Sequence, residues 1–192
     1  ITVQEDATAE LAEDEKLVCT VDGDTLCIRF MSDANRDGFE GEKFLTVSLP
    51  WELVKNAHFE EIDIETTNAY AYVSADAQKI KLSTVGGDAR VMGASCPAVE
   101  IETVSGNAGV VDGTWAKVDI STVSGAIELA GDADSAGIET TSGKTDIAGA
   151  LGALEFASVS GNLILSSERA LRLDAKTTSG RIDLTLTERD AF

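Results

Sequence analysis

The residues best placed to do chemistry are hydroxyl side chains that recur every 18 or 19 positions beside a glycine. The first row of them consists of Thr66, Thr84, Thr103, Thr122, Thr140, Ser158 and Thr177. The second row lies two positions further along and consists of Asn68, Gly86, Ser105, Ser124, Ser142, Ser160 and Ser179. The two rows share parity, so in strands they would point to one side as a double hydroxyl array. Such an array could bind a glycan or another repetitive surface.

A structural role for the same hydroxyls stays open. Ser and Thr side chains commonly hydrogen-bond to neighbouring backbone in turns, and both rows flank a turn. In the binding interpretation the hydroxyls are free to hydrogen-bond to a ligand, whereas in the structural interpretation they are occupied by the backbone.

A second column of residues alternates with apolar positions and is expected to face outward. It consists of Asp63, Lys81, Glu100, Asp119, Gly137, Glu155 and Asp174. Glu100 and Asp119 would lie about one strand spacing apart, where like charges repel unless they are screened or bind a cation. Calcium favours clustered oxygen ligands, but the Gly-Gly-x-Gly-x-Asp motif of calcium-binding rolls is missing from the sequence. We therefore expect a solvated acidic face, with no metal site and no cofactor.

Enzymatic chemistry has little support in the sequence. His58 is the only histidine, and no Ser/His/Asp or Cys/His set has supporting spacing. The sequence also lacks a Gly-Lys-Ser/Thr phosphate loop and a cysteine pair spaced for zinc. Paired carboxylates could hydrolyse glycosides, and Trp51 and Trp115 could stack on sugars, although we expect Trp115 to cover a coil edge. We predict that the protein is not an enzyme, with a carbohydrate-active enzyme using an acidic groove as the alternative.

Composition narrows the class of partner. The 192 residues include 34 Asp and Glu against 15 Lys and Arg, which gives a net charge of −19. This excess argues against binding to nucleic-acid phosphates or anionic lipid surfaces, and it fits a well-solvated surface or a basic partner. No run of 18 apolar residues is present, so we expect no membrane-spanning segment. Because the chain begins with Ile1, we expect a processed form or a fragment cut downstream of a targeting or anchoring segment.

The hydroxyl rows belong to a pattern that is repeated seven times. Its best copies are Ile101-Glu-Thr-Val-Ser-Gly106 and Ile120-Ser-Thr-Val-Ser-Gly125, and the steps between turn positions are 18, 19, 19, 18, 18 and 19 residues. Each copy contains two alternating apolar runs of strand length on either side of the turn. A steady period of this kind predicts a right-handed, single-chain parallel β-helix of about seven coils. A β-sandwich would explain the alternation but not the constant step.

The N-terminal third breaks the repeat pattern. We expect residues 1–60 to form an acidic arm, a β-hairpin and a cap, and residues 61–192 to form the β-helix, together as one structural domain. Residues 1–16 could be a frayed arm, an edge strand at 1–3 or a short helix. The other elements expected here are a hairpin at 17–30, a polar loop at 31–42, a strand at 43–49 and a helical turn or irregular crossover at 51–58.

Asp22-Gly23 is a two-residue turn signal between the strands of the hairpin. A turn at these residues sets Leu17 opposite Ile28 and Cys19 opposite Leu26, so that apolar residues face apolar residues.

The three cysteines cannot all pair within the chain. In the register above, Cys27 faces Val18 on the side of the sheet away from Cys19. A three-residue loop would instead set Cys19 opposite Cys27. We expect free thiols at these two positions, and we expect Cys96 to be packed in an inter-coil loop.

The repeated Thr-Val-Ser-Gly turns follow an entry segment, Leu45-Thr-Val-Ser-Leu-Pro50, and then Ile62-Asp-Ile-Glu-Thr-Thr67. With these features the chain resembles, over about residues 17–187, a bacterial adhesin family of β-helix surface domains with serial T-V-S-G repeats. The resemblance implies an extracellular or envelope-associated protein, anchored through a segment absent here. It supplies no catalytic residues.

We therefore expect a non-enzymatic interaction scaffold of a bacterial cell surface. Its ligand, an unknown glycan or protein, would dock on a solenoid face or on the loops at 31–42 and 111–116. A structural or stress-sensing ectodomain is a further alternative. The last coil, at 184–192, would be open to pairing with a second copy of the chain, so a homodimer through a solenoid end is also expected.

Overall fold

The computed structural model describes residues 1–8, 16–30, 43–50, 59–168 and 172–186, and in these ranges every regular element is a β-strand. The chain divides into two compact units, Ile1–Asn56 and Ala57–Phe192. No helix in the described part of the chain has the length and hydropathy that crossing a membrane requires.

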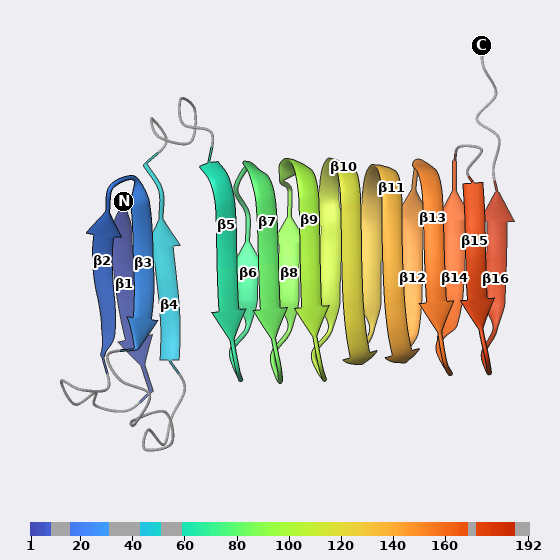
Figure 1. Cartoon of the computed structure of the whole chain (residues 1–192), viewed down its shortest axis with the longest axis horizontal. Coiled ribbons are helices and arrows are strands. Elements are labelled where there is room, and N and C mark those ends of the chain that lie inside the picture. Colours follow the sequence, from blue (N-terminus) through green and yellow to red (C-terminus); the bar gives the residue numbers. More distant parts are fainter. Residues whose placement is uncertain (9–15, 31–42, 51–58, 169–171, 187–192) are drawn as a thin grey trace, which may run out of the picture. The chain divides into compact units, whose positions relative to one another are not determined.

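The second unit is a parallel β-solenoid of seven coils, which confirms the predicted fold class (Figure 1). Two strands, β10 (Ala108–Ser124) and β11 (Ile127–Ser142), turn through a corner and contribute to both of its strand stacks. The longer stack adds β5 (Phe59–Thr66), β7 (Ala77–Thr84), β9 (Ser95–Thr103), β13 (Leu151–Ser158) and β15 (Arg172–Thr177). The shorter stack adds β6 (Ala71–Val73), β8 (Ala89–Met92), β12 (Lys144–Gly149), β14 (Asn162–Ser167) and β16 (Ile182–Leu186). The right-handed winding stays a prediction.

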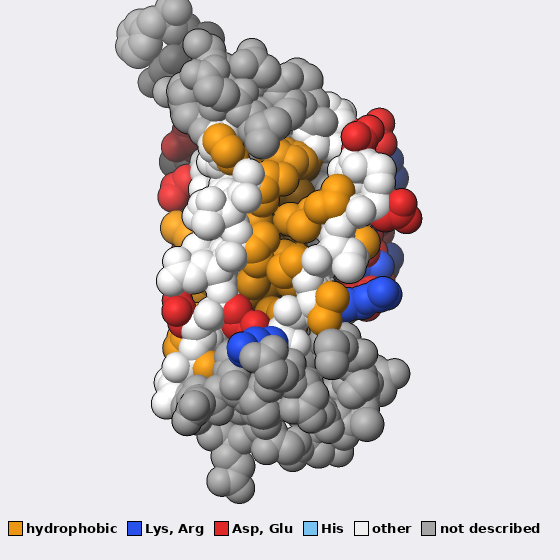
Figure 2. All heavy atoms as spheres, turned by 90° about the vertical axis from the view of Figure 1, so that its left-hand side faces the viewer, with side chains coloured by type: hydrophobic (Ala, Val, Ile, Leu, Met, Phe, Trp, Pro, Cys, Tyr) orange, Lys and Arg blue, Asp and Glu red, His pale blue; other side chains and the backbone are white. Residues whose placement is uncertain are grey.

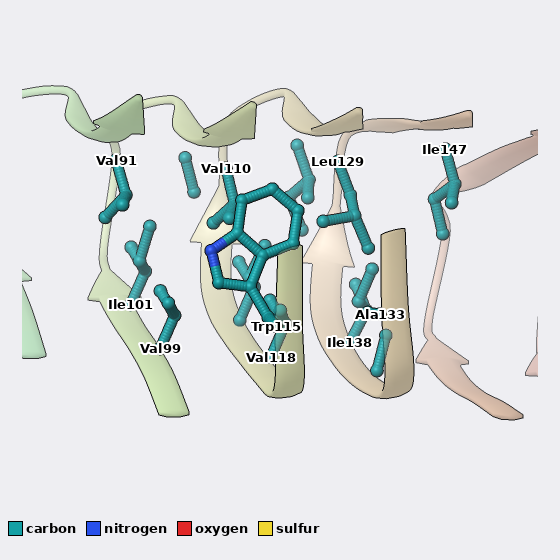
Figure 3. Packing of buried hydrophobic residues seen from close by; sticks show 14 of the residues in the cluster. Val91, Val99, Ile101, Val110, Trp115, Val118, Leu129, Ala133, Ile138 and Ile147 are labelled. Carbon is teal, nitrogen blue, oxygen red and sulfur yellow. The ribbon is translucent and has the colours of Figure 1, made fainter. Parts of the chain in front are cut away.

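The register places equivalent residues of successive coils directly above one another. One inward column runs Ile64, Leu82, Ile101, Ile120, Ile138, Phe156 and Ala175. Figure 3 shows the facing wall, where Val91, Val110, Leu129 and Ile147 follow one another into the same core. Alternation along each strand sends every second side chain inward, so the apolar runs of the sequence become one continuous core.

A bulge at Asp112, between the third and fourth coils, absorbs one extra residue. Up to Val111 the chain pairs with residues 19 positions later, and from Gly113 it pairs with residues 18 positions later. Asp112 itself has a φ of 59°, a conformation that Asp tolerates better than most residues.

The glycines that close the Thr-x-Ser-Gly corners are required by close stacking. A Cβ at Gly106 would collide with the carbonyl oxygen of Gly87, and a Cβ at Gly125 with that of Gly106. The approach of the preceding coil therefore excludes a side chain at these positions, and at Gly125 a φ of 158° is a second reason for glycine.

The N-terminal unit contains two separate two-stranded antiparallel sheets. Strand β1 (Thr2–Ala7) pairs with β4 (Lys43–Ser48), and β2 (Leu17–Asp22) pairs with β3 (Thr25–Phe30). Of the three options for residues 1–16, an edge strand is therefore present, and it is longer than expected. The predicted 31–42 loop and 51–58 crossover, with Trp51 and His58, lie outside the described residues.

The predicted hairpin register is wrong. The turn residues are Gly23 and Asp24, because Asp22 pairs with Thr25 and Cys19 lies opposite Ile28. Gly23 has a φ of 59°, which suits glycine at the first central position of a two-residue turn better than at the second. Cys27 then faces Thr20, on the other side of the sheet from Cys19. All three cysteines are free, as expected.

Candidate functional site

The threonine row lies inside the solenoid. Thr84, Thr103, Thr122 and Thr140 are 2 to 6% exposed. Each follows two inward apolar residues at the same parity, so the alternation that buries those residues also buries the threonine. The expectation that both hydroxyl rows form one outward array is therefore wrong. In the remaining coils Thr66, Ser158 and Thr177 are half-buried.

The buried hydroxyls stabilise the corners. Thr103 Oγ1 accepts a hydrogen bond from the backbone N–H of Gly106 (2.9 Å) and donates one to the carbonyl oxygen of the same residue (3.0 Å). The equivalent N–H bonds run from Gly87 to Thr84 (3.1 Å) and from Gly161 to Ser158 (2.6 Å). A buried backbone N–H needs a partner, and these threonines and the serine supply it.

The serine row lies outside and binds backbone of the preceding coil. Ser105 Oγ donates to the carbonyl oxygen of Val85 at 3.0 Å, and the corresponding bonds of Ser124, Ser142 and Ser160 measure 3.4, 3.5 and 3.2 Å. Ser105, Ser124, Ser160 and Ser179 are exposed, and Ser142 is half-buried. Turn hydrogen bonding, the alternative interpretation of these rows, is thus what most members of both rows do, while Oγ1 of Thr122 and of Thr177 has no hydrogen-bond partner among the described residues. Binding of a ligand by the outer row stays a prediction.

Sequence reasoning missed an exposed apolar column between the two rows. It is formed by Val85, Val104, Val123 and Val159, each about half exposed at the corner. The signal was present in the sequence, because each valine directly follows an inward threonine and must point the other way.

The predicted acidic column stacks as expected. Its seven members pair in succession, from Asp63 through Lys81, Glu100, Asp119, Gly137 and Glu155 to Asp174. A groove of about 390 Å³ lies over this column on the longer stack. The carboxylates that line it are Glu100, Glu102, Asp119, Glu139, Glu155 and Asp174.

Gly137 gives this groove its depth. It is the one member of the column without a side chain, and it lies between Asp119 and Glu155. A Cβ added at Gly137 would approach Asp119 Oδ1 to 2.8 Å, so the carboxylate leans into the space that the glycine leaves. The hollow therefore has acidic residues on both sides along the solenoid axis.

Lysines pair with three of the six groove carboxylates, Glu100, Asp119 and Asp174. Lys79 Nζ lies 3.2 Å from Glu100, Lys117 Nζ lies 2.6 Å from Asp119, and Lys176 Nζ lies 3.0 Å from Asp174. The hydrogen bond to Glu100 raises the pKa of Lys79, and the hydrogen bond to Asp119 raises the pKa of Lys117. Ion pairs to described residues are absent at Glu102, Glu139 and Glu155. These three carboxylates can accept a cationic group from outside.

Two further expectations concern side chains outside the groove. Trp115 is 2% exposed and packs in the core, where its ring occupies the space beside Gly113 and Gly131 (Figure 3). It can neither stack on a sugar nor cover a coil edge from outside, so that expectation is wrong. Cys96 is packed as expected, but it lies within β9 and not in a loop. Among the described residues no three His, Cys, Asp or Glu side chains are placed to hold a metal ion.

Comparison with protein families identifies the family of this chain. A protein-family model described as Toastrack DUF4097 matches residues 12–192 of the chain. No curated protein and no solved structure matches it.

Proposed function

The chain belongs to the Toastrack DUF4097 family, and from this membership and its β-solenoid we propose that it is a non-enzymatic interaction scaffold of a bacterial cell surface or envelope. In this proposal the solenoid acts as an adhesin that binds another protein through a basic segment. The family match begins at residue 12, so it covers most of the N-terminal unit as well as the solenoid.

The acidic groove of the longer stack is the observation that carries the proposal. Its carboxylates repeat at about the strand spacing, so they offer a row of acceptors along the axis rather than a single point charge. Lysine or arginine side chains of a partner would form charge-assisted hydrogen bonds with them. The net charge of −19 would also speed the approach of a basic partner.

The outer serine row supports the proposal less well than the groove. Its hydroxyls already donate to carbonyl oxygens of the preceding coil, and a ligand would have to compete with those bonds. The groove carboxylates Glu102, Glu139 and Glu155 have no such competitor among the described residues.

A binding experiment with matched variants tests the proposal. The probe is a labelled oligolysine peptide, and binding to the full chain is measured by fluorescence anisotropy at physiological ionic strength. We expect E102Q/E139Q/E155Q to weaken binding at least tenfold. The control, E128Q/D146N/D183N, removes the same number of charges from the shorter stack and should change binding less than threefold.

The outcomes separate the groove from net charge and from catalysis. Equal weakening by both triple variants would show attraction to overall charge and would overturn the groove as the binding site. Release of reducing ends from a polysaccharide, lost in E155Q, would instead favour the carbohydrate-active enzyme. A chain with neither activity would favour the structural or stress-sensing ectodomain. Protease treatment of intact cells that produce the natural protein tests the surface location, because only an exposed solenoid would be cleaved.

A further inference from the structure

The C-terminal coil of the solenoid exposes apolar side chains, two of which lie in columns that the interior coils bury. Ile182, Leu184 and Leu186 on β16 are 38, 46 and 55% exposed, whereas the equivalent Leu163 and Leu165 one coil earlier are 0 and 1% exposed. In β15 the inward Leu173 and Ala175 are only half-buried. This coil presents apolar side chains of the core together with the outer edges of β15 and β16, with which no other described strand pairs.

The first coil has the complementary edge. Strand β5 is the terminal strand of its stack, and no other described strand pairs with its outer side. Its inward side chains Ile62 and Ile64 are half-buried, unlike Ile80 and Leu82 in the next coil. A β5 strand placed over β15 of another copy would continue the same column of inward residues, with Ile62 over Leu173 and Ile64 over Ala175.

In this register, basic side chains of the C-terminal coil would face acidic side chains of β5. Strand β5 carries Glu60, Glu61, Asp63 and Glu65 and no basic residue. The C-terminal coil carries Arg172, Lys176 and Arg181 against Asp174 and Asp183. The described residues 172–186 thus carry three basic and two acidic side chains, whereas β5 carries four acidic ones.

Column positions bring specific opposite charges together. Arg172 occupies the column of Glu61, and Lys176 occupies the column of Glu65. One pair of this kind already exists between the first two coils, where Lys79 Nζ lies 3.6 Å from Glu61 in the same column. Among the described residues, the pair of like charges in this register is Asp63 over Asp174. Lys176 Nζ lies 3.0 Å from the carboxylate of Asp174 and offsets its charge.

The shorter stack adds an aromatic contact. Tyr70 and Tyr72 in the first coil are exposed and stacked, with ring centroids 6.4 Å apart. Tyr70 directly precedes Ala71, and Arg181 directly precedes Ile182. Because Ala71 and Ile182 belong to one column, Tyr70 and Arg181 occupy equivalent positions in the first and last coils. Arg181 of one copy would thus lie beside the tyrosine pair of the next, in reach of a cation–π interaction.

We propose that the C-terminal coil binds the first coil of a second copy of this chain, head to tail, with the strand register of the solenoid continued across the contact. The backbone groups on the free edges of β15 and β16 then gain partners, as edge strands tend to do. Because two different surfaces meet, the contact is heterologous, and repeated contacts generate an open chain of copies rather than a closed dimer. The contact requires the outer edge of β5 to be accessible in the full chain.

Charge reversal in the full chain tests this proposal by sedimentation velocity over a range of concentrations at low salt. The wild type is expected to form a series of species larger than a dimer as concentration rises. K176E and E65K should each weaken association at least tenfold, and the double variant K176E/E65K should restore it, since the two charges exchange places. The control K144E has the same charge change as K176E in the shorter stack of an interior coil, and should associate as the wild type does.

Three outcomes would overturn the proposal. The first is a monomer at all concentrations. The second is association that responds to K176E but not to E65K, which would indicate C-terminal coils meeting each other. The third is failure of the double variant to restore association while circular dichroism shows all variants to be folded. Loss of oligolysine binding would leave this proposal untouched, since that experiment concerns the groove of a single copy.

Discussion

The N-terminal unit and the solenoid both consist of short strands with alternating apolar residues, yet they use the alternation differently. In the solenoid the interior strands have neighbours on both sides, and their inward side chains stack into one core. In the N-terminal unit two separate two-stranded sheets form, and none of its described side chains is buried. Phe44, Leu45 and Val47 of β4 are 42 to 52% exposed. Figure 2 shows hydrophobic side chains open at the surface of one face of the molecule.

The difference shows that alternating apolar residues along a strand are not enough to bury their side chains. A two-stranded sheet is only marginally stable in water, whereas each stacked coil covers the apolar residues of its neighbour. Full burial of one Leu or Ile side chain stabilises by about 1.5–3 kcal/mol, and the solenoid repeats that gain in every interior coil. Most of the stability should therefore lie in the second unit.

The test with the largest expected effect on stability shortens one apolar side chain in each unit. Leu129 is fully buried, so L129A should destabilise the solenoid by about 2–5 kcal/mol through lost burial and the cavity left behind. Val21 on β2 is 73% exposed, so V21A should change stability by about 0.5 kcal/mol or less. Urea denaturation followed by far-ultraviolet circular dichroism measures both. Similar losses for the two variants would mean that the N-terminal unit is packed as tightly as the solenoid.

A second test adds a methyl group where coils approach most closely. G106A places a Cβ against the carbonyl oxygen of Gly87, and backbone movement to relieve this contact should cost about 1–3 kcal/mol. G23A has open space around its Cβ, and only its positive φ opposes the substitution. Thermal unfolding should show a large loss of melting temperature for the solenoid in G106A only. An unchanged melting temperature in G106A would contradict the close stacking.

A third test compares threonines from the two units. T103V keeps the shape of the side chain but leaves the buried N–H of Gly106 without its acceptor, so we expect a loss of about 1–2 kcal/mol. T20V alters an exposed strand residue of β2 and should be nearly neutral. Hydrogen exchange of the Gly106 amide provides a local readout, because it should accelerate in T103V and stay slow in T20V. Slow exchange in both would show that water or another group replaces the hydroxyl.

The smallest expected effect concerns thiol chemistry and leaves stability unchanged. Burial raises the pKa of the Cys96 thiol, and the thiolate is the reactive form. Cys19 is exposed in the N-terminal unit. In the C27S background, Cys96 should react with a disulfide reagent at pH 8 about tenfold or more slowly than Cys19. Equal rates would indicate that β9 opens to solvent in the folded protein.

Much of the solenoid could be predicted because period and parity are properties of the sequence alone. The constant step identified the coils, and the alternation placed Glu100 and Asp119 in one outward column. The hairpin register failed because Asp22-Gly23-Asp24 offers two possible two-residue turns, and only the backbone angle at Gly23 separates them. The threonine row was placed on the wrong side because its parity was compared with the serines and not with the apolar residues before it.

The groove could be predicted only in part. Its acidic column follows from the register, but the hollow depends on the absence of a side chain at Gly137, between Asp119 and Glu155. Trp115 shows the same limit, because part of the room for its ring comes from Gly131 on the next coil. Such spaces arise from residues that are distant in sequence until the coils are stacked.

The bulge at Asp112 has a consequence for how this protein can change length during evolution. A single-residue deletion within a strand would turn all later side chains of that strand to the opposite face, so it should be eliminated by selection. At Asp112 the register has already shifted by one residue without disturbing the columns on either side. Insertions and deletions of one residue should therefore accumulate at this corner among related sequences, while larger changes should come as whole coils of 18 or 19 residues.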